Sequence, residues 1–471
     1  MPLKLRVMYS KRRTIMVHTI HTGLIMLLAA FHLASVSGCA IVEYGTHANE
    51  GPVLTSPSPT RATTKISSSD LKNGTFIGIA MSGGGSRAAN FSAAALLQLE
   101  SLGILQQATA LSSVSGSSLT AAYYGLFSEE KIHHWNPQQV RKRLVKNFEL
   151  EWFGRWFLPW NIGRYWFTGF DRSDIMADVF DHNLFEDKTF GQMPKATPKI
   201  LINATSLTEN GALFLFTDEA FNKIGSGLDN YAVSRAVMAS GAFPGAFHNV
   251  TLRDYTQPKQ YIHLFDGGPS DNLGINSLRK IARDLYLEPE TEHPKKCLVL
   301  IVDAYTEGWN LSREVSDTRK AITDFVIDTN ALEASSVLLA LRRDILLEEM
   351  GIRPAGNKAP DVYQTFRLFA EADDPEIKKH PKLKDVECHA WLITFQRLQH
   401  LTHLPNAGTI AAIVNNIPTR YTLLAPHGLG AAEAQEALFA AAEMLIKEDK
   451  ETLAAICKDF GDNFAGLKCP Q

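Results

Sequence analysis

The chain has 471 residues, of which 45% are hydrophobic and 21% are charged, and its formal net charge is −3. These values are typical of a globular protein that has enough apolar residues for a large core. The net charge is slightly negative, whereas nucleic-acid-binding proteins are typically strongly basic, so no nucleic-acid partner is expected.

The first 38 residues differ from the remainder in both charge and hydropathy. They carry five bases and no acid, so the rest of the chain has a net charge of −8. An apolar stretch over residues 15–36 follows the bases. A basic start, an apolar stretch and small residues at its end predict a secretory signal, although the stretch is also long enough for an uncleaved transmembrane anchor.

A short motif at the end of this segment favours the signal. The sequence Val36-Ser37-Gly38-Cys39 resembles a bacterial lipoprotein box, in which an aliphatic residue and two small residues precede Cys. The resemblance implies that residues 1–38 are removed and that Cys39 is acylated, which anchors the protein to a membrane. The non-acidic Ala40 favours the outer membrane of a bacterial envelope over the inner one. The alternative is a chance Cys at the end of a helix.

A Ser/Thr/Pro-rich stretch follows Cys39 and predicts a flexible tether. Beyond it, strand-like and helix-like segments alternate, which predicts an α/β fold with a mainly parallel central sheet covered by helices. The expected strands are 76–81, 111–114, 200–205, 262–265, 298–303 and 390–395, and the expected helices are 87–102, 119–127, 317–349 and 431–447. The predicted organisation is a signal at 1–38, a tether at 39–72, one large domain at 73–448 and a C-terminal helical tail at 449–471.

Five cysteines are present, and lipidation of Cys39 leaves four. Cys297 lies in an apolar strand-like run and is expected to be a buried thiol. Cys457 and Cys469 are the expected disulfide pair if the compartment is oxidising. No cysteine or histidine cluster has the spacing of metal ligands, so no metal site is predicted.

A run of small residues lies where an expected strand meets a helix. In Ser113-Val114-Ser115-Gly116-Ser117 the spacing is that of a nucleophile elbow, with serines in place of both outer glycines. Ser115 follows the last apolar residue of the strand, as this geometry requires. Ser117 and Ser118 are the alternative nucleophiles, but that register places the serine inside the first helical turn.

A glycine-rich loop follows the first expected strand and opens a helix. The residues Gly83, Gly84 and Gly85 allow backbone N–H groups to approach a ligand closely, and the helix N-terminus favours an anion. We expect them to form an oxyanion hole, with Arg87 either fixing the loop or adding charge. The loop also fits the dinucleotide-binding pattern G-x-G-x-x-A, but no acid follows at the distance that this pattern requires.

The candidate base is Asp266, which follows another strand-like run and precedes two glycines. An ionised carboxylate within hydrogen-bond reach of a serine hydroxyl can accept its proton. The alternative is a loop Asp that binds its own turn. Asp271 and Asn272 are expected to cap this turn.

In this order, the three motifs resemble the patatin-like phospholipases. Gly83-Gly84-Gly85-x-Arg87 is similar to their oxyanion loop, Ser115 stands at the position of their catalytic serine, and Asp266 begins their catalytic Asp-Gly-Gly motif. The resemblance to the bacterial branch of the family covers residues 75–448 and includes Asn203-Ala-Thr-Ser-Leu, the run from Arg235 to Pro244 and Ile417-Pro-Thr419. The serines at 113 and 117 depart from the family pattern.

The resemblance implies a three-layer patatin-like fold and a hydrolase that cleaves lipid acyl esters through a Ser115–Asp266 dyad and an acyl-enzyme, without a cofactor. Gly84 and Gly85 are then expected to hold the oxyanion. A dyad needs no histidine, and we expect His248 and His263 to be structural. The alternatives are an acyltransferase that uses the same dyad and a non-catalytic, membrane-anchored binding lipoprotein.

The segment 152–170 is rich in aromatic residues and contains two arginines. Aromatic side chains combined with arginine favour a membrane interface or an acyl-chain groove. A core helix is an equally good interpretation. The expected partners are therefore a lipid substrate and a membrane surface, reached through Cys39 and this segment.

Overall fold

The computed structural model describes residues 49–51, 66–194, 198–289, 293–306, 329–352, 361–369, 378–419, 424–425, 429–464, 467 and 469. The predicted signal 1–38, its lipidation site Cys39 and most of the tether lie outside the described residues. Within the described ranges, no helix is long and apolar enough to cross a membrane.

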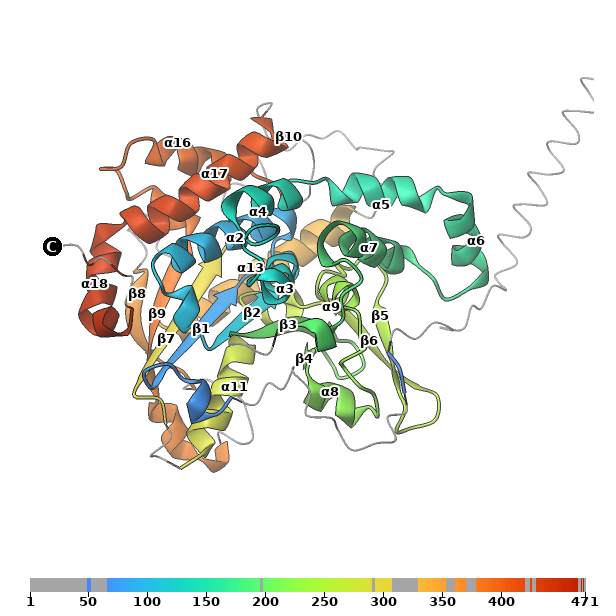
Figure 1. Cartoon of the computed structure of the whole chain (residues 1–471), viewed down its shortest axis with the longest axis horizontal. Helices are drawn as coiled ribbons and strands as arrows, with labels where there is room; N and C mark the ends of the chain where they lie inside the picture. Colours follow the sequence, from blue (N-terminus) through green and yellow to red (C-terminus); the bar gives the residue numbers. More distant parts are fainter. Residues whose placement is uncertain are drawn as a thin grey trace, which may run out of the picture.

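A nine-stranded mixed sheet forms the centre of the fold, in the order β5-β6-β3-β2-β1-β7-β9-β8, with β4 beside β3 (Figure 1). The five central strands, from β3 to β9, run parallel, and the strands at both edges are antiparallel. The strands are β1 (Thr75–Met81), β2 (Ala110–Val114), β3 (Lys199–Ser206), β4 (Ala212–Leu215), β5 (Val250–Asp254), β6 (Gln260–Asp266), β7 (Lys296–Asp303), β8 (Tyr363–Arg367) and β9 (Glu387–Thr394). A separate two-stranded pair joins β10 (Leu424–Ala425) and β11 (Leu429–Gly430).

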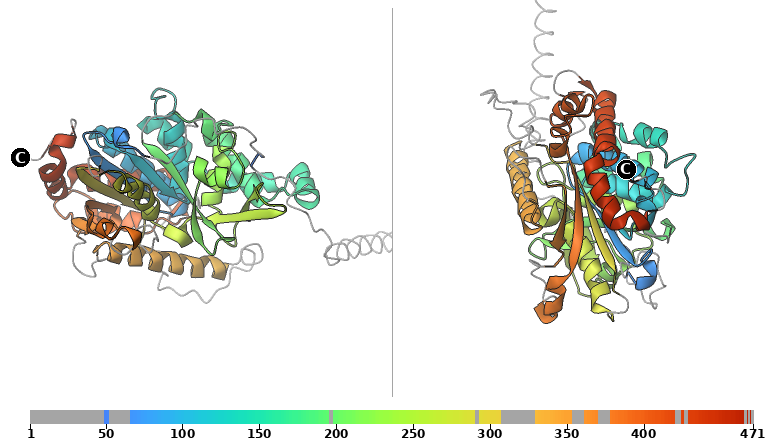
Figure 2. Two further views of the ribbon diagram at one scale, coloured as in Figure 1. Left: turned by 90° about the horizontal axis from the view of Figure 1, so that it is seen from below. Right: turned by 90° about the vertical axis from the view of Figure 1, so that its left-hand side faces the viewer.

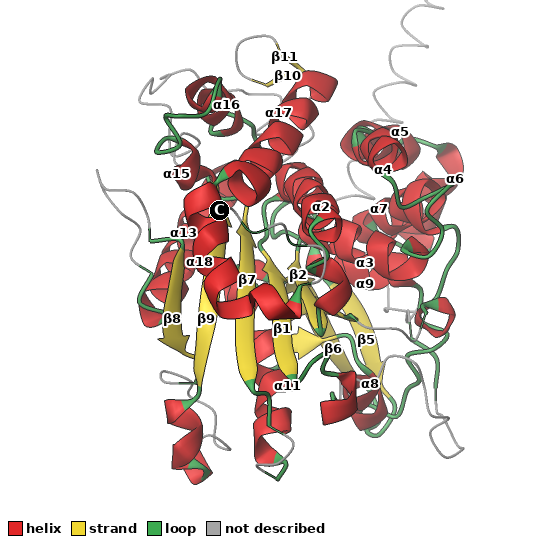
Figure 3. Ribbon diagram, turned by 60° about the vertical axis from the view of Figure 1, so that its left-hand side comes forward, coloured by secondary structure: helices red, strands yellow, loops and turns green. Residues whose placement is uncertain are grey.

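Helices cover both faces of this sheet, and Figure 2 shows α13 on one face and α17 on the other. Helices and strands are distinguished by colour in Figure 3. The helices are α2 (Gly85–Ser101), α3 (Ser117–Phe127), α4 (Pro137–Leu144), α5 (Phe148–Trp156), α6 (Pro159–Phe167), α7 (Arg172–Phe180), α8 (Asp218–Lys223), α9 (Val233–Ser240), α10 (Gly268–Asp271), α11 (Ile275–Leu287), α13 (Thr329–Glu349), α15 (Phe395–Leu398), α16 (Ala407–Val414), α17 (Ala431–Glu443) and α18 (Lys450–Phe460).

The central strands are apolar along their whole length because both of their faces are covered. All seven residues of β1 are buried. Ile77, Ile79 and Met81 belong to the larger core cluster with α2 and α3, whereas Phe76 and Ala80 belong to the cluster that contains α11. Alternate side chains of a strand point to opposite faces, so one strand contributes to both cores.

The predicted α/β fold with a mainly parallel sheet is confirmed. The six expected strands correspond to β1, β2, β3, β6, β7 and β9. The short antiparallel strands β4, β5 and β8 were not expected from the sequence. The strands β5 and β8 are only partly buried and have no continuous apolar run, and β4 is apolar but has only four residues. Part of the expected helix 317–349 is present as α13, and residues 317–328 lie outside the described ranges.

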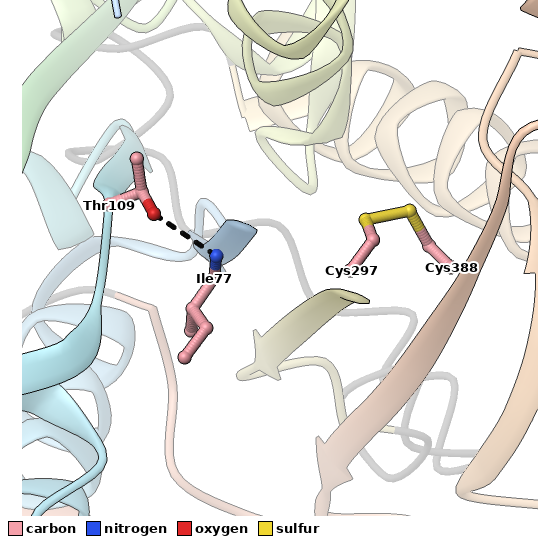
Figure 4. Close-up of a disulfide and its surroundings, with 4 residues drawn as sticks. All are labelled: Ile77, Thr109, Cys297 and Cys388. Carbon is pink, nitrogen blue, oxygen red and sulfur yellow. Dashed lines mark hydrogen bonds between the residues drawn. A yellow bond between two sulfur atoms is a disulfide. The ribbon is translucent and has the colours of Figure 1, made fainter. Parts of the chain in front are cut away.

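Two disulfides join strands and segments of the body. Cys457 pairs with Cys469, as predicted. The prediction of a free buried thiol at Cys297 is wrong, because Cys297 on β7 is bonded to Cys388 on the neighbouring strand β9 (Figure 4). The bond closes a loop of 91 residues. In the loop-entropy model, this lowers the entropy of the unfolded chain and raises the free energy of unfolding by about 4.5 kcal/mol.

The C-terminal helix α18 packs on the same body. Its Leu453, Ile456 and Phe460 side chains are buried in the larger core cluster. The following Asn463 donates a hydrogen bond to Thr75 Oγ1 at the start of β1, with a length of 2.7 Å. The end of the chain is therefore attached to the first strand of the sheet.

Candidate active site

The ends of β1, β2 and β6 bring the predicted site residues together. The parallel register pairs Met81 with Ser113, so the glycine loop after β1 lies beside Ser115 after β2. On the other side, Val114 pairs with Asn203 of β3, and the adjacent Ala204 pairs with Asp266 of β6. The topology thus places the candidate base Asp266 two strands away from the candidate nucleophile Ser115.

Ser115 occupies a sharp turn between β2 and α3. Its φ of +54° lies in the left-handed region, which costs a non-glycine residue about 1–2 kcal/mol. Such strain is typical of functional sites. The turn exposes the Ser115 side chain in part, whereas Ser112, Ser113, Ser117 and Ser118 are fully buried.

The buried serines have structural partners. Ser117 Oγ lies within hydrogen-bond distance of the Met81 and Val114 carbonyl oxygens, and Ser118 Oγ bonds to Ser113 Oγ. Neither side chain is accessible to a substrate. The geometry therefore favours the register in which Ser115 is the nucleophile.

Ser115 Oγ donates a hydrogen bond to Asp266 Oδ2 over 2.7 Å. The other carboxylate oxygen, Oδ1, accepts the Gly268 N–H at 2.8 Å. Asp266 is only 1% exposed, and its burial raises the pKa of the carboxyl to about 6, against the opposing effect of these two hydrogen bonds. At neutral pH the carboxylate is ionised and is a stronger base than an exposed Asp.

The glycine loop presents two backbone N–H groups at the start of α2. The neighbouring amides are occupied, because Gly83 donates to the Asn272 carbonyl at 3.0 Å and Ser86 donates to the Thr419 carbonyl at 2.9 Å. Within the described part of the chain, the N–H groups of Gly84 and Gly85 have no protein acceptor. The N-terminal end of a helix adds partial positive charge to such donors. This arrangement can bind an oxyanion at Gly84 and Gly85, while Gly83 shapes the loop.

The loop and the elbow approach each other too closely for side chains. Gly84 and Gly85 have φ angles of +138° and +57°, which favour glycine. A Cβ atom on Gly116 would overlap the carbonyl oxygen of Gly85. Gly116 is therefore the glycine that this elbow requires. The serines at 113 and 117 replace outer glycines without obstruction, because Ser113 lies in β2 and Ser117 begins α3.

Arg87 is buried behind the glycine loop. Its Nε donates to the Ala304 carbonyl at 2.8 Å, and one terminal nitrogen donates to the Ile417 carbonyl at 2.7 Å and to Thr306 Oγ1 at 3.1 Å. Burial lowers the pKa of the guanidinium to about 10. Of the two roles expected for Arg87, these contacts favour fixing the loop, because they tie α2 to segments that follow β7 and α16.

Two further residues hold this geometry and were not predicted from the sequence. Ser240, the last residue of α9, accepts the Ser115 N–H on its hydroxyl at 2.9 Å and the Gly267 N–H on its carbonyl at 3.1 Å. Thr205 Oγ1 donates to the Asp266 carbonyl at 2.7 Å. Both residues lie in segments that resemble the family, but their roles depend on contacts between distant parts of the chain.

The remaining predicted residues have structural contacts. Asp271 is fully buried, and its carboxylate accepts N–H groups of Leu273, Gly274 and Asn276, as expected of a turn cap. The Asn272 carbonyl accepts the Gly83 N–H.

Of the two histidines near the motifs, His263 is half-buried and His248 is exposed. His263 Nδ1 bonds to Thr251 Oγ1 at 2.9 Å, and the His248 carbonyl accepts the Ser173 hydroxyl at 2.6 Å. Burial lowers the pKa of both imidazoles. Among the described residues, no group of three or more His, Cys, Asp or Glu side chains is placed to hold a metal ion.

Comparison with solved structures gives low similarity over most of the chain. Human GIVD cytosolic phospholipase A2 is 13% identical over 84% of this chain and 61% of its own, with a TM-score of 0.44. VipD from Legionella pneumophila is 13% identical over 79% of this chain and 67% of its own, with a TM-score of 0.27. The present chain thus spans about three fifths of the length of the human enzyme.

Comparison with protein families gives a direct match. No curated protein matches the chain. Residues 79–279 match the family model of the patatin-like phospholipases, and this range includes the glycine loop, Ser115 and Asp266. Over residues 79–279, the chain is therefore similar to the patatin-like phospholipases.

Proposed function

We propose that this protein is a lipid acyl hydrolase that cleaves phospholipid acyl esters, with Ser115 as the nucleophile and Asp266 as its base. The observation that carries the proposal is the 2.7 Å contact between Ser115 Oγ and Asp266 Oδ2, made by the one partly exposed serine of the elbow. The patatin-like family match supports a lipid ester as the substrate class.

The geometry supports a two-step mechanism. Asp266 accepts the hydroxyl proton as Ser115 Oγ attacks the ester carbonyl carbon, and the Gly84 and Gly85 N–H groups stabilise the resulting oxyanion. The intermediate collapses to an acyl-enzyme, and the leaving alcohol takes the proton from Asp266. Asp266 then removes a proton from water as the water oxygen attacks the acyl-enzyme. The bond between Ser115 Oγ and the acyl carbon breaks, Ser115 Oγ takes this proton back from Asp266, and the fatty acid is released.

The alternative of a non-catalytic binding lipoprotein rested on the missing outer glycines of the elbow. Two features of the site weaken this alternative. The serines at 113 and 117 fit their positions without distorting the turn, and the required Gly116 is present. A scaffold protein would also have no need for a buried carboxylate beside a strained, partly exposed serine.

For the location, we propose an oxidising compartment of a bacterial envelope, with lipidated Cys39 as the anchor and the aromatic segment 152–170 as a second contact with the membrane. The two disulfides support an oxidising compartment. In cell fractionation of a chain that also carries Phe157→Ser, Trp160→Ser and Phe167→Ser, which removes the second contact, Cys39→Ala is expected to move the protein from the membrane to the soluble fraction. Full retention of Cys39→Ala on membranes would contradict the anchor.

The test of the activity is release of fatty acid from phospholipid vesicles. We expect Ser115→Ala and Asp266→Asn to reduce the rate by at least about 10³-fold, whereas the buried-serine control Ser112→Ala retains it. Equal rates for all four proteins would contradict the proposal. Transfer of acyl groups to an added alcohol in preference to water would replace the hydrolase by the acyltransferase alternative.

A further inference from the structure

The helices α5 and α6 expose an unusual amount of apolar surface. Their large hydrophobic side chains with more than a third of their surface exposed include Phe153, Phe157, Trp160, Ile162, Trp166 and Phe167. Two views show that this pair of helices extends from one end of the body (Figure 1, Figure 2). We call the six side chains the aromatic face.

The inner side of the same helices is firmly attached to the body. Trp152 is buried, its indole N–H donates to the Arg172 carbonyl at 2.8 Å, and its ring contacts Phe247. Asn161 of α6 donates to the Arg155 carbonyl of α5 at 2.9 Å, which fixes one helix to the other. The inner side of this segment therefore belongs to the protein core, as the core interpretation expects. The outer side is the exposed aromatic face, which the interface interpretation concerns.

Charge indicates what the aromatic face contacts. Residues 152–170 contain Arg155 and Arg164 and no acid, whereas the chain beyond residue 38 has a net charge of −8. Arg155 forms an ion pair with Glu151 of the same helix, so Arg164 carries the positive charge of this surface. Arg164 is exposed and lies over the Phe170 ring, with 3.5 Å between the guanidinium carbon and the ring centroid. Aromatic rings with adjacent arginines fit the interfacial region of a bilayer, where the rings enter the acyl boundary and the guanidinium groups meet lipid phosphates.

A continuous series of packed helices connects this face to the candidate active site. The helix α5 packs on α7, and α7 packs on α9. The last residue of α9 is Ser240, which binds the Ser115 N–H. A membrane bound at the aromatic face would therefore be held in a fixed position relative to the nucleophile.

We propose that the aromatic face is a membrane-docking surface that inserts into the interface of an anionic phospholipid bilayer. The proposal rests on the proposed function, because that function requires the substrate to come from a bilayer. Docking positions the enzyme on the membrane independently of the lipid at Cys39, and the exposed Arg164 selects for anionic headgroups.

The test measures binding to vesicles of phosphatidylethanolamine and phosphatidylglycerol by the full chain with Cys39→Ser, which cannot be acylated. The variant Phe157→Ser/Trp160→Ser/Phe167→Ser removes three side chains that are 60%, 62% and 86% exposed. The matched control Val337→Ser/Leu338→Ser/Leu341→Ser removes three side chains of α13 that are 58%, 65% and 56% exposed. Because interfacial binding scales with buried apolar area, we expect at least about a tenfold loss of affinity for the first variant and less than about twofold for the control.

Two additional measurements separate docking from catalysis and from self-association. Hydrolysis of a short soluble ester should stay unchanged in both triple variants, and Ser115→Ala should bind vesicles as well as its parent. If the parent binds through the aromatic face but releases no fatty acid, docking stands and the proposed activity fails. Unchanged vesicle affinity of the first triple variant would overturn the docking proposal. If sedimentation then showed an oligomer dissociating in that variant, the face would be a contact between copies of the chain.

Discussion

The hydroxyl of Ser240 accepts the backbone N–H of Ser115 over 2.9 Å, and the carbonyl of the same Ser240 accepts the N–H of Gly267, the residue after Asp266. One residue at the end of α9 therefore holds the backbone N–H of Ser115 and the backbone N–H of the residue that follows Asp266. The first contact offsets part of the cost of the left-handed conformation at Ser115.

Loss of this hydroxyl is expected to affect turnover more than substrate binding. Ser240→Ala leaves the Ser115 N–H without its acceptor, so the hydroxyl of Ser115 is less well aimed. We expect kcat on a soluble ester to fall by about 10–100-fold, with KM within about twofold. Ser112→Ala is the control, because Ser112 is equally buried but bonds to Ser277 and Asn203 instead. Equal losses in both variants would mean that Ser240 acts only through general packing.

The activity is expected to depend on the ionisation of Asp266. Burial raises the pKa of this carboxyl to about 6, and the protonated form cannot accept the Ser115 proton. A plot of kcat/KM against pH should therefore rise to a plateau with an apparent pKa of about 6, which reports the free enzyme. If kcat/KM had already reached its plateau at about pH 5, as for a base with the ordinary pKa of Asp, the assignment of the base would be contradicted.

The same pKa shift predicts a stability cost. Between the usual pKa of 3.8 and the raised pKa of about 6, the unfolded chain loses the proton of Asp266 while the folded protein keeps it, so stability falls as pH rises through this window. At higher pH the loss is complete and amounts to about 3 kcal/mol. Asp266→Asn should therefore be stabilising relative to the wild type near pH 8, by an amount that disappears in acid. Thermal unfolding of both proteins across this pH range measures the difference, and a pH-independent difference would contradict it.

The contact between the elbow and the glycine loop predicts a sensitive glycine. In Gly116→Ala the new methyl group meets the Gly85 carbonyl oxygen, which belongs to backbone and must shift. Because this moves an oxyanion donor, we expect at least about a 10²-fold loss of kcat on a soluble ester. A Cβ atom on Gly408, in α16, meets nothing within 4 Å, so Gly408→Ala should retain full activity. Full activity of Gly116→Ala would show that the close approach is not needed for catalysis.

Much of the site could be predicted because its residues follow apolar strands. Ser115 and the glycine loop each come directly after a buried strand of a parallel sheet, so their side-by-side placement follows from the fold class. Asp266 reaches the same place by another route, because β6 is antiparallel to β3 and ends level with Ser115. Ser240 could not be assigned in this way. Its role depends on the position of the end of α9 relative to β2, and the local sequence pattern does not predict this position.

The same limit applies to the cysteines and to the first glycine. The sequence around Cys297 is that of an apolar strand and gives no sign of a disulfide. Its partner Cys388 lies 91 residues later, on a strand whose position depends on the sheet order. The Gly83 N–H is bound by Asn272, so of the three predicted glycines only Gly84 and Gly85 retain N–H groups that can receive an oxyanion. The local sequence does not distinguish Gly83 from Gly84 and Gly85, because all three are adjacent glycines of the same loop.

The central claim is that Ser115 is an activated nucleophile, and covalent labelling with a fluorophosphonate tests it most directly. Peptide mapping of the labelled, folded protein should find a single adduct on Ser115, and Asp266→Asn should slow the labelling. An adduct on Ser117 or Ser118, or a folded protein that takes no label, would contradict the claim.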